Sequence, residues 1–203
     1  MHKIARAGVI AAALSLIAAS AAWAQQPGRI RGQIEKADGP MLSVKTRDGA
    51  TINVTVDEKA RVSALVKASL ADIKQDSFIG IGGMPQADGT IKAFSIHIFL
   101  PAQRAAVPQR HGPWDARPGS TMTNAVVGNM VTSKDGETLT VKYQDGEKTV
   151  IVGPDTEIAA VAPASKDELK AGVQIIIMAS EKQQDGSALA KSLYVGRGLT
   201  PAM

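Results

Sequence analysis

The chain has 203 residues and contains no cysteine. Disulfides, thiolate metal sites, iron–sulfur clusters and cysteine nucleophiles are therefore excluded, and so is a lipidated N-terminal cysteine. Aromatic residues are scarce, at three Phe, two Trp and two Tyr, and 23 basic residues face 19 acidic ones. Because recognition of single-stranded nucleic acid needs stacking aromatics beside a basic groove, this composition argues against nucleic-acid binding.

Long hydrophobic runs are absent too, except at the N-terminus. There Lys3 and Arg6 precede an apolar run over residues 7–22, which ends in an A-x-A site closed by Ala24. A basic start, a short apolar run and small residues at the end are typical of a secretory signal peptide. We therefore expect residues 1–24 to be removed after Ala24, which lowers the formal net charge from +4 to +2 through the loss of Lys3 and Arg6.

A membrane anchor is the alternative for this segment, but the run is short and Ala-rich. No later stretch approaches the roughly 18 consecutive apolar residues that a membrane span needs. We therefore expect no membrane span in the mature chain.

The rest of the chain carries one pattern twice, at an offset of 96–97 residues. Matched positions include Gly32 and Gly128, Asp48-Gly49 and Asp145-Gly146, Ser69 and Ser165, and Asp88-Gly89 and Asp185-Gly186. Recurrence of the same glycines, Asp-Gly pairs and serines in the same order indicates a duplication. We expect one repeat over 28–100, a second over 124–198, and a proline-rich strap over 101–123 between them.

Each repeat is dominated by strand patterns. Asp-Gly pairs between alternating apolar segments predict hairpins, because glycine reaches positive φ without a Cβ clash. The predicted strands lie near 29–37, 40–47, 50–56, 77–84 and 90–99, and near 125–133, 137–143, 147–152, 173–181 and 187–196.

A short helix is expected between the third and fourth strands of each repeat. Ser69 and Ser165 each stand three residues before an acid, Asp72 or Glu168, as at a capped helix start. The element order β-β-β-α-β-β is that of an OB-fold, so the sequence predicts an all-β protein of two tandem OB-like five-stranded β-barrels. A meandering five-stranded sandwich would produce a similar pattern.

The alternation of apolar residues also predicts the core. The expected core residues of the first repeat are Ile34, Leu42, Val44, Ile52, Val54, Ile79, Ile81, Ile96 and Ile98. Those of the second are Val127, Leu139, Val141, Val150, Val152, Ile175, Ile177, Leu193 and Val195.

The repeated frame resembles a bacterial domain-of-unknown-function family of OB-like repeats. It consists of G-x-[IM]-x-x-x-D-G, L-x-V, an Asp-Gly turn, a capped S-x-x-[DE]-[IL]-K turn and a closing D-G-x-x-x-A strand. The mature chain is similar to exported paired-repeat proteins of proteobacteria, including the bridge His111-Gly-Pro-Trp114-Asp115. Some of these carry a metal ABC transporter permease label, from which this chain departs because no span is expected. The resemblance implies the fold and a periplasmic location, and no catalytic residue.

The strap holds the chemically unusual residues. Four prolines in this stretch oppose both helix and central strand. His111, Trp114, Asp115 and Arg117 lie here and are the candidate ligand-binding residues, because loops on rigid scaffolds often carry function. The alternative is that Trp114 plugs the interface of the two barrels while His111 is solvated.

A copper(I) site is the second hypothesis, since imidazole and thioether ligands suit that ion. Its candidate ligands are His97, His111, Met122 and Met130, with Met84 as a further thioether. No H-x-H, M-x-M or closely spaced His-Met pair occurs among them. His97 lies between Ile96 and Ile98 in a strand, so we expect it on the face opposite them, exposed to solvent.

No catalytic motif is recognisable. Neither G-x-S-x-G nor H-E-x-x-H occurs, and the glycines over 80–83 lie in a predicted strand without the Lys-Ser/Thr of a phosphate loop. The sequence therefore predicts a non-enzymatic periplasmic binding protein without a cofactor, whose partner is another envelope protein or a small ligand. The alternative is a soluble copper carrier.

Overall fold

The computed structural model describes residues 29–133 and 136–201. The predicted signal peptide over 1–24 and its cleavage site lie outside these residues. In the part of the chain that is described, every regular element is a strand or a short 3-10 turn, so the fold is all-β as predicted. Within these ranges there is no helix with the length and apolar character to cross a membrane.

Ten of the eleven strands fall on the ten predicted runs. The strands are β1 (Ile30–Asp38), β2 (Met41–Thr46), β3 (Thr51–Lys67), β4 (Phe78–Pro85), β5 (Ile91–Ile98), β6 (Arg110–Pro113), β7 (Thr121–Ser133), β8 (Gly136–Tyr143), β9 (Gly146–Pro163), β10 (Gln174–Lys182) and β11 (Ala188–Arg197). Strand β6 was not predicted, because it lies in the proline-rich strap. Strands β3 and β9 are 17 and 18 residues long, far longer than predicted.

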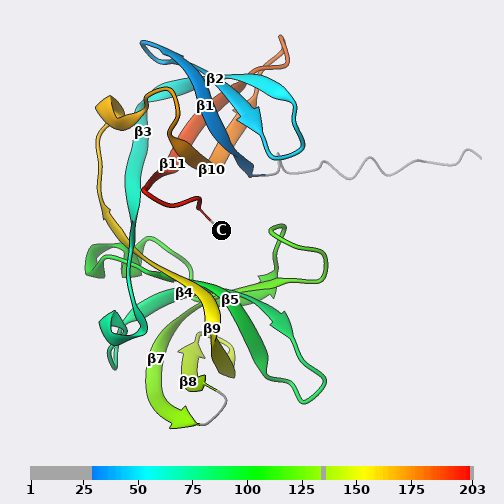
Figure 1. Ribbon diagram of the computed structural model, residues 1–203, viewed down its shortest axis with the longest axis vertical. Coiled ribbons are helices and arrows are strands. Elements are labelled where there is room, and N and C mark those ends of the chain that lie inside the picture. Colours follow the sequence, from blue (N-terminus) through cyan, green and yellow to red (C-terminus); the bar gives the residue numbers. More distant parts are fainter. Residues whose placement is uncertain (1–28, 134–135, 202–203) are drawn as a thin grey trace, which may run out of the picture.

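The strands close into two five-stranded rings. Barrel A has the order β1-β2-β3-β11-β10 and closes through the pairing of β10 with β1. Barrel B has the order β7-β8-β9-β5-β4 and closes through the pairing of β4 with β7. In each ring one pairing is parallel, β3 with β11 and β5 with β9. Figure 1 shows barrel A above barrel B, with β3 and β9 running from one to the other.

Each barrel contains strands from both halves of the chain. Barrel A joins β1–β3 to the last two strands, whereas β4 and β5 of the first half complete barrel B. The expected arrangement, one barrel within 28–100 and another within 124–198, therefore differs from the observed pairing. Barrel B is continuous in sequence from β4 to β9, and barrel A is built from the segments on either side of it.

This exchange of strands between the two halves follows from the length of β3 and β9. In each, the alternating pattern breaks at a four-residue bulge, over 57–60 and 153–156, opposite a single residue of the neighbouring strand. The strand then continues for several residues, each of which advances the chain about 3.3 Å toward the other barrel. There β3 and β9 pair antiparallel, with Leu65 opposite Val161 at the centre of the ladder. These two positions are 96 residues apart, which equals the offset of the predicted repeats.

The two barrel interiors contain the predicted core residues. Each interior combines residues from both halves of the chain. Ile34 and Leu42 of the first half pack with Ile175 and Leu193 of the second inside barrel A. Ile79 and its neighbours pack with second-half residues inside barrel B. Of the eighteen predicted residues, only Ile52 and Ile98 are partly rather than fully buried.

The two predicted helices are single 3-10 turns, η1 (Leu70–Asp72) and η3 (Lys166–Glu168), and a third turn, η2 (Pro101–Ala105), opens the strap. The predicted caps are present. The Ser69 backbone N–H donates to Asp72 Oδ2 at 2.8 Å, and the Ser165 N–H donates to Glu168 Oε1 at 3.3 Å. The cap residues were predicted correctly, but the turn ends after three residues as the chain enters the next ring.

Candidate ligand-binding pocket at the barrel junction

A third group of buried side chains fills the space between the barrels and is called the junction layer here. Its buried members are Leu65, Trp114, Met122, Ala159, Val161 and Ile176. They come from the outer faces of both rings and from the strap. The two barrels are therefore held together by apolar packing as well as by the β3–β9 ladder.

Trp114 is part of this layer and is only 9% exposed. The Arg29 guanidinium lies 3.7 Å from the centroid of its ring. Asp115 accepts a hydrogen bond from Arg31 at 2.7 Å and lies 3.4 Å from Arg29. Burial by itself raises the pKa of Asp115, but the Arg31 hydrogen bond and the two positive charges hold it below its usual value. The expectation that Trp114 plugs the barrel interface fits this packing, and its ring is covered rather than open to a ligand.

The four candidate ligand residues of the strap are not brought together. His111 Nδ1 lies 2.8 Å from Thr123 Oγ1, and the ring is 6.0 Å from that of Tyr143, which packs against the barrel B core. Arg117 instead stacks on Phe94, at 4.1 Å from the ring centroid. His111 is partly buried, so the expectation that it is solvated holds only in part.

His97 lies on the face opposite Ile96 and Ile98, as expected, but it is fully buried rather than solvated. This correction has a simple cause. His97 pairs with Ala159, a member of the junction layer, so this part of β5 lies against the layer between the barrels, which the sequence does not reveal. Neither ring nitrogen has a hydrogen-bond partner, and burial lowers the pKa of His97 to about 3.

The candidate copper ligands are also separated. Met122 belongs to the junction layer, whereas Met130 packs against the barrel B core. His111 and His97 lie on strands β6 and β5, with β7 and β4 between them. Among residues 29–133 and 136–201 no three His, Cys, Asp or Glu side chains form a group that could hold a metal ion.

Polar atoms without partners concentrate on the outer face of barrel B. Ser95 and Glu157 are register partners on β5 and β9, and His97 lies two residues along from Ser95. Ser95 Oγ, both nitrogens of His97 and Glu157 Oε1 are buried and form no hydrogen bond with any described residue. Unpaired buried polar atoms cost free energy, so a group of them points to a bound water or ligand.

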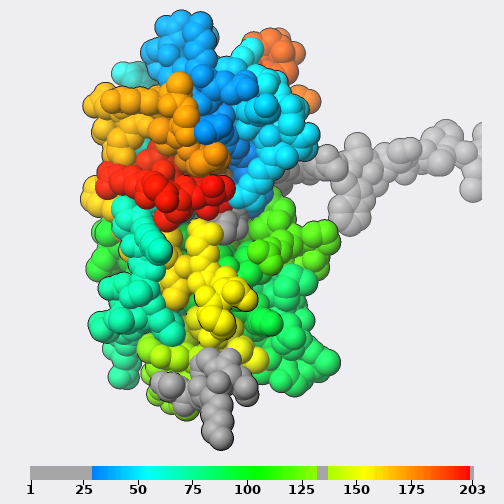
Figure 2. Space-filling model, in the orientation of Figure 1, coloured from blue at the N-terminus to red at the C-terminus, as the bar shows by residue number. Residues whose placement is uncertain are grey.

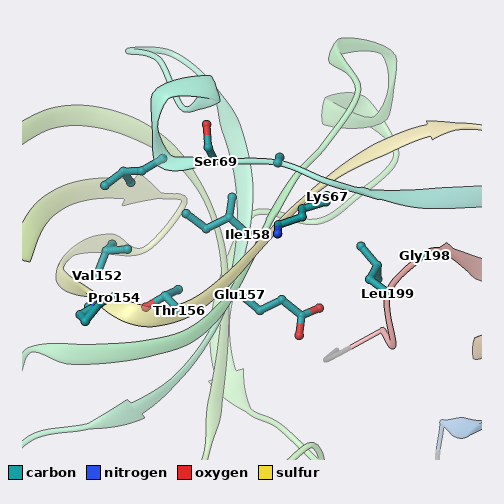
Figure 3. Close-up of a pocket in the computed structure, with 12 residues that line it drawn as sticks. Lys67, Ser69, Val152, Pro154, Thr156, Glu157, Ile158, Gly198 and Leu199 are labelled. Carbon is teal, nitrogen blue, oxygen red and sulfur yellow. The ribbon is translucent and has the colours of Figure 1, made fainter.

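Glu157 also lines a pocket of about 500 Å³, called the Glu157 pocket here. It lies between the end of β3, the β9 bulge and residues 198–201, which are called the C-terminal segment here. Figure 3 shows the Glu157 side chain extending toward that segment. The lining residues are Lys67, Ala68, Ser69, Leu70, Val152, Gly153, Pro154, Thr156, Glu157, Ile158, Gly198 and Leu199. Most of this wall is apolar, and its charged residues are Glu157 and Lys67.

The charge of Glu157 is poorly compensated. Burial raises its pKa above the usual value, and the charge of Arg47 offsets this only in part. Arg47 donates instead to the backbone carbonyl of Pro201, and the described residues offer Glu157 no ion pair. An apolar pocket with one poorly neutralised carboxylate is a suitable binding site for a ligand that carries a positive charge.

The C-terminal segment forms one wall of the Glu157 pocket. In Figure 2 it lies across the boundary between the two barrels. Leu199 packs on the junction layer, and the Leu199 carbonyl oxygen would be only 2.0 Å from a Cβ placed on Gly196. A glycine at position 196 therefore allows the chain to turn back over the junction, and the hydrogen bond from Arg47 to Pro201 fixes its end.

The sequence did not single out Glu157. The strand predicted near 147–152 ends before the run over 153–156, because a bulge there breaks the two-residue alternation. A signal is nevertheless present. After the bulge the alternation resumes through Glu157, Ala159 and Val161, which places one acid on an otherwise apolar face.

Comparison with known proteins gives no match to a family model, a curated protein or a solved structure. The resemblance to exported proteins of paired OB-like repeats stays a prediction. The functional argument therefore rests on the geometry of this chain alone.

Proposed function

We propose that this is a non-catalytic binding protein that takes a small ligand with a cationic group and an apolar body in the Glu157 pocket. The observation that carries this proposal is the half-buried Glu157 carboxylate, whose Oε1 has no partner within an apolar wall. An ammonium or guanidinium group would neutralise the carboxylate and supply the missing hydrogen bond. The apolar part of the ligand would cover Leu70, Ile158 and Leu199.

The scaffold supports binding without chemistry. A nucleophile activated by a base needs two side chains within hydrogen-bond reach of each other. In the pocket, the Ser69 hydroxyl donates to Asp72 Oδ2 at 2.8 Å, within the cap of the η1 turn. Glu157 Oε1 has no hydrogen-bond partner among the described residues. The pocket therefore offers a charge and a shape rather than an assembled catalytic pair.

The proposal includes the origin and location of the protein. We propose that the two rings are OB-like, since each is a closed five-stranded ring with one parallel pairing, β3 with β11 and β5 with β9, and that they arose by duplication of one five-stranded unit. The common order of the rings and the 96-residue offset of Leu65 and Val161 support this view. The N-terminal pattern ending at Ala24 supports export to the periplasm.

Titration with hexylammonium, and with hexanol as a neutral probe of the same length, tests the proposal. Two-dimensional NMR of the protein should show saturable shifts at Leu70, Ile158 and Leu199 with hexylammonium and much weaker ones with hexanol. Glu157→Gln keeps the shape of the side chain and removes its charge, so it should weaken hexylammonium binding at least tenfold. Binding should also weaken on acidification, as Glu157 takes up a proton at its raised pKa.

Glu147→Gln is the matched control, because Glu147 lies on the same strand with its side chain 53% exposed. It should leave the affinity unchanged. Equal affinities of Glu157→Gln and the unchanged protein, or shifts outside the pocket only, would contradict the proposal.

A further inference from the structure

We propose a second binding site, for a small organic anion, on the outer face of barrel B where Arg117 stacks on Phe94. This hollow has a volume of about 610 Å³ and, like the Glu157 pocket, borders the β9 bulge at Gly153, Pro154 and Thr156. Its charged lining residues are Lys92, Arg117 and Asp155. Two cations against one acid leave the hollow with a net positive charge.

The Arg117 guanidinium is held in place but is not neutralised. Phe94 supports one face of it at 4.1 Å. Its backbone is fixed by Ser120, whose Oγ accepts from the Arg117 N–H at 3.2 Å and donates to the Arg117 carbonyl at 2.7 Å. Among the described residues it has no acidic partner within ion-pair distance. The planar edge of the group is therefore free to form two parallel hydrogen bonds with a carboxylate or phosphate.

Phe94 is itself held in a fixed position. A Cβ placed on Gly82 would lie 2.9 Å from the Phe94 ring, so the ring covers the glycine of the neighbouring strand. Lys92 lies two residues before Phe94 on β5 and, like Arg117, has no ion pair with any described residue. A rigid stacked guanidinium with a flexible ammonium beside it is a suitable arrangement for one anionic group.

Barrel A provides an internal comparison. Ala93 pairs with Val152 in barrel B as Ala190 pairs with Val56 in barrel A, so Lys191 occupies the position of Phe94. There a hollow lined by Asp57 and Lys191 contains a cation, Lys191, that is neutralised within the protein.

Lys191 lies 2.7 Å from Asp57 and 3.7 Å from Glu181. Lys191 of barrel A is therefore paired within the protein. At the related position of barrel B, Phe94 instead supports Arg117, a cation that is left for a ligand.

Titration with benzoate, phenyl phosphate and the uncharged benzyl alcohol tests this site in the intact protein. NMR should show saturable shifts at Lys92, Phe94 and Arg117 with one or both anions and none with benzyl alcohol. Comparison of benzoate with phenyl phosphate then identifies the preferred anionic group. Binding should weaken as the salt concentration rises, because the attraction is electrostatic.

Arg117→Gln should weaken binding of the preferred anion at least tenfold, and Arg117→Lys should weaken it less, since the charge remains without the planar edge. Lys191→Gln, at the related position of barrel A, should leave the affinity unchanged. The spectrum of each variant shows directly whether the fold is retained. No saturable shift with either anion, or equal affinity of Arg117→Gln and the unchanged protein, would overturn the proposal.

Discussion

Acidification should destabilise this protein through His97, and replacing that residue should remove the effect. Burial is the only cause that lowers the pKa of His97 from 6.5 to about 3. The unfolded chain therefore takes up a proton near pH 6.5, whereas the folded chain does so only near pH 3. Since the folded pKa is the lower one, stability is fully present above pH 6.5 and is lost as the pH falls below it.

The size of this effect follows from the shift. Between the two pKa values the free energy of unfolding should fall by about 1.4 kcal/mol per pH unit. Between pH 7.5 and pH 4.5 the loss that is due to His97 should therefore be about 3 kcal/mol. Glu157 acts in the opposite sense, because its pKa is raised by burial and its protonation favours the folded state. A comparison of two variants at each pH is needed to isolate His97.

Urea unfolding of the unchanged protein and of His97→Leu at four pH values between 7.5 and 4.5 is the assay. At pH 7.5 the Leu variant should be as stable or more stable, because it removes two unpaired buried nitrogens. At pH 4.5 its advantage should have grown by about 3 kcal/mol. His111→Gln is the control and should leave most of the pH dependence intact, because His111 is partly exposed. Parallel pH profiles of the His97→Leu variant and the unchanged protein would refute the reasoning.

Three further predictions concern the fold. Leu65→Ala, at the centre of the β3–β9 ladder, should lower the free energy of unfolding by about 2–5 kcal/mol. Met41→Ala, whose side chain is 59% exposed, should change it by less than about 1 kcal/mol, and urea unfolding distinguishes the two. The fragment 69–164 contains all five ring strands of barrel B and should fold alone by circular dichroism and NMR, whereas 28–100 contains parts of both rings and should not. A folded 28–100 would contradict the strand exchange. Gly196→Ala should displace the C-terminal segment and lower the free energy of unfolding by about 1–3 kcal/mol. Gly112→Ala should be tolerated, because a Cβ there meets nothing within 4 Å. An unshifted Leu199 amide signal in Gly196→Ala would contradict this.

The local structure was predictable because it depends on neighbours in the sequence. Alternation with a period of two defines which face of a strand is apolar, and Asp-Gly pairs define where it turns. The ten strand positions, the cap residues Ser69 and Ser165 and the buried faces follow from these rules. The turn after each cap was predicted as a helix, but each is a 3-10 turn of only three residues.

The candidate sites were less predictable, because each depends on what covers a surface. The sequence placed His97 on the correct face of its strand but did not show that this residue is buried beside the junction layer. Arg117 was identified as a candidate from its place in the strap, yet its support by Phe94 arises only from the tertiary structure. Glu157 was missed because the bulge before it resembles the end of a strand.

The sequence alone determined the strands and their apolar faces, and only the tertiary structure decided which strand completes which barrel. Ile79 and Ile81 of β4 and Ile175 and Ile177 of β10 present the same inward apolar pattern, so the alternation alone assigns neither strand to a ring. Local chemistry cannot separate two pairings that bury equivalent side chains. The choice is made by the continuation of β3 and β9 beyond their bulges, which carries the following strands away from their own ring and into the other.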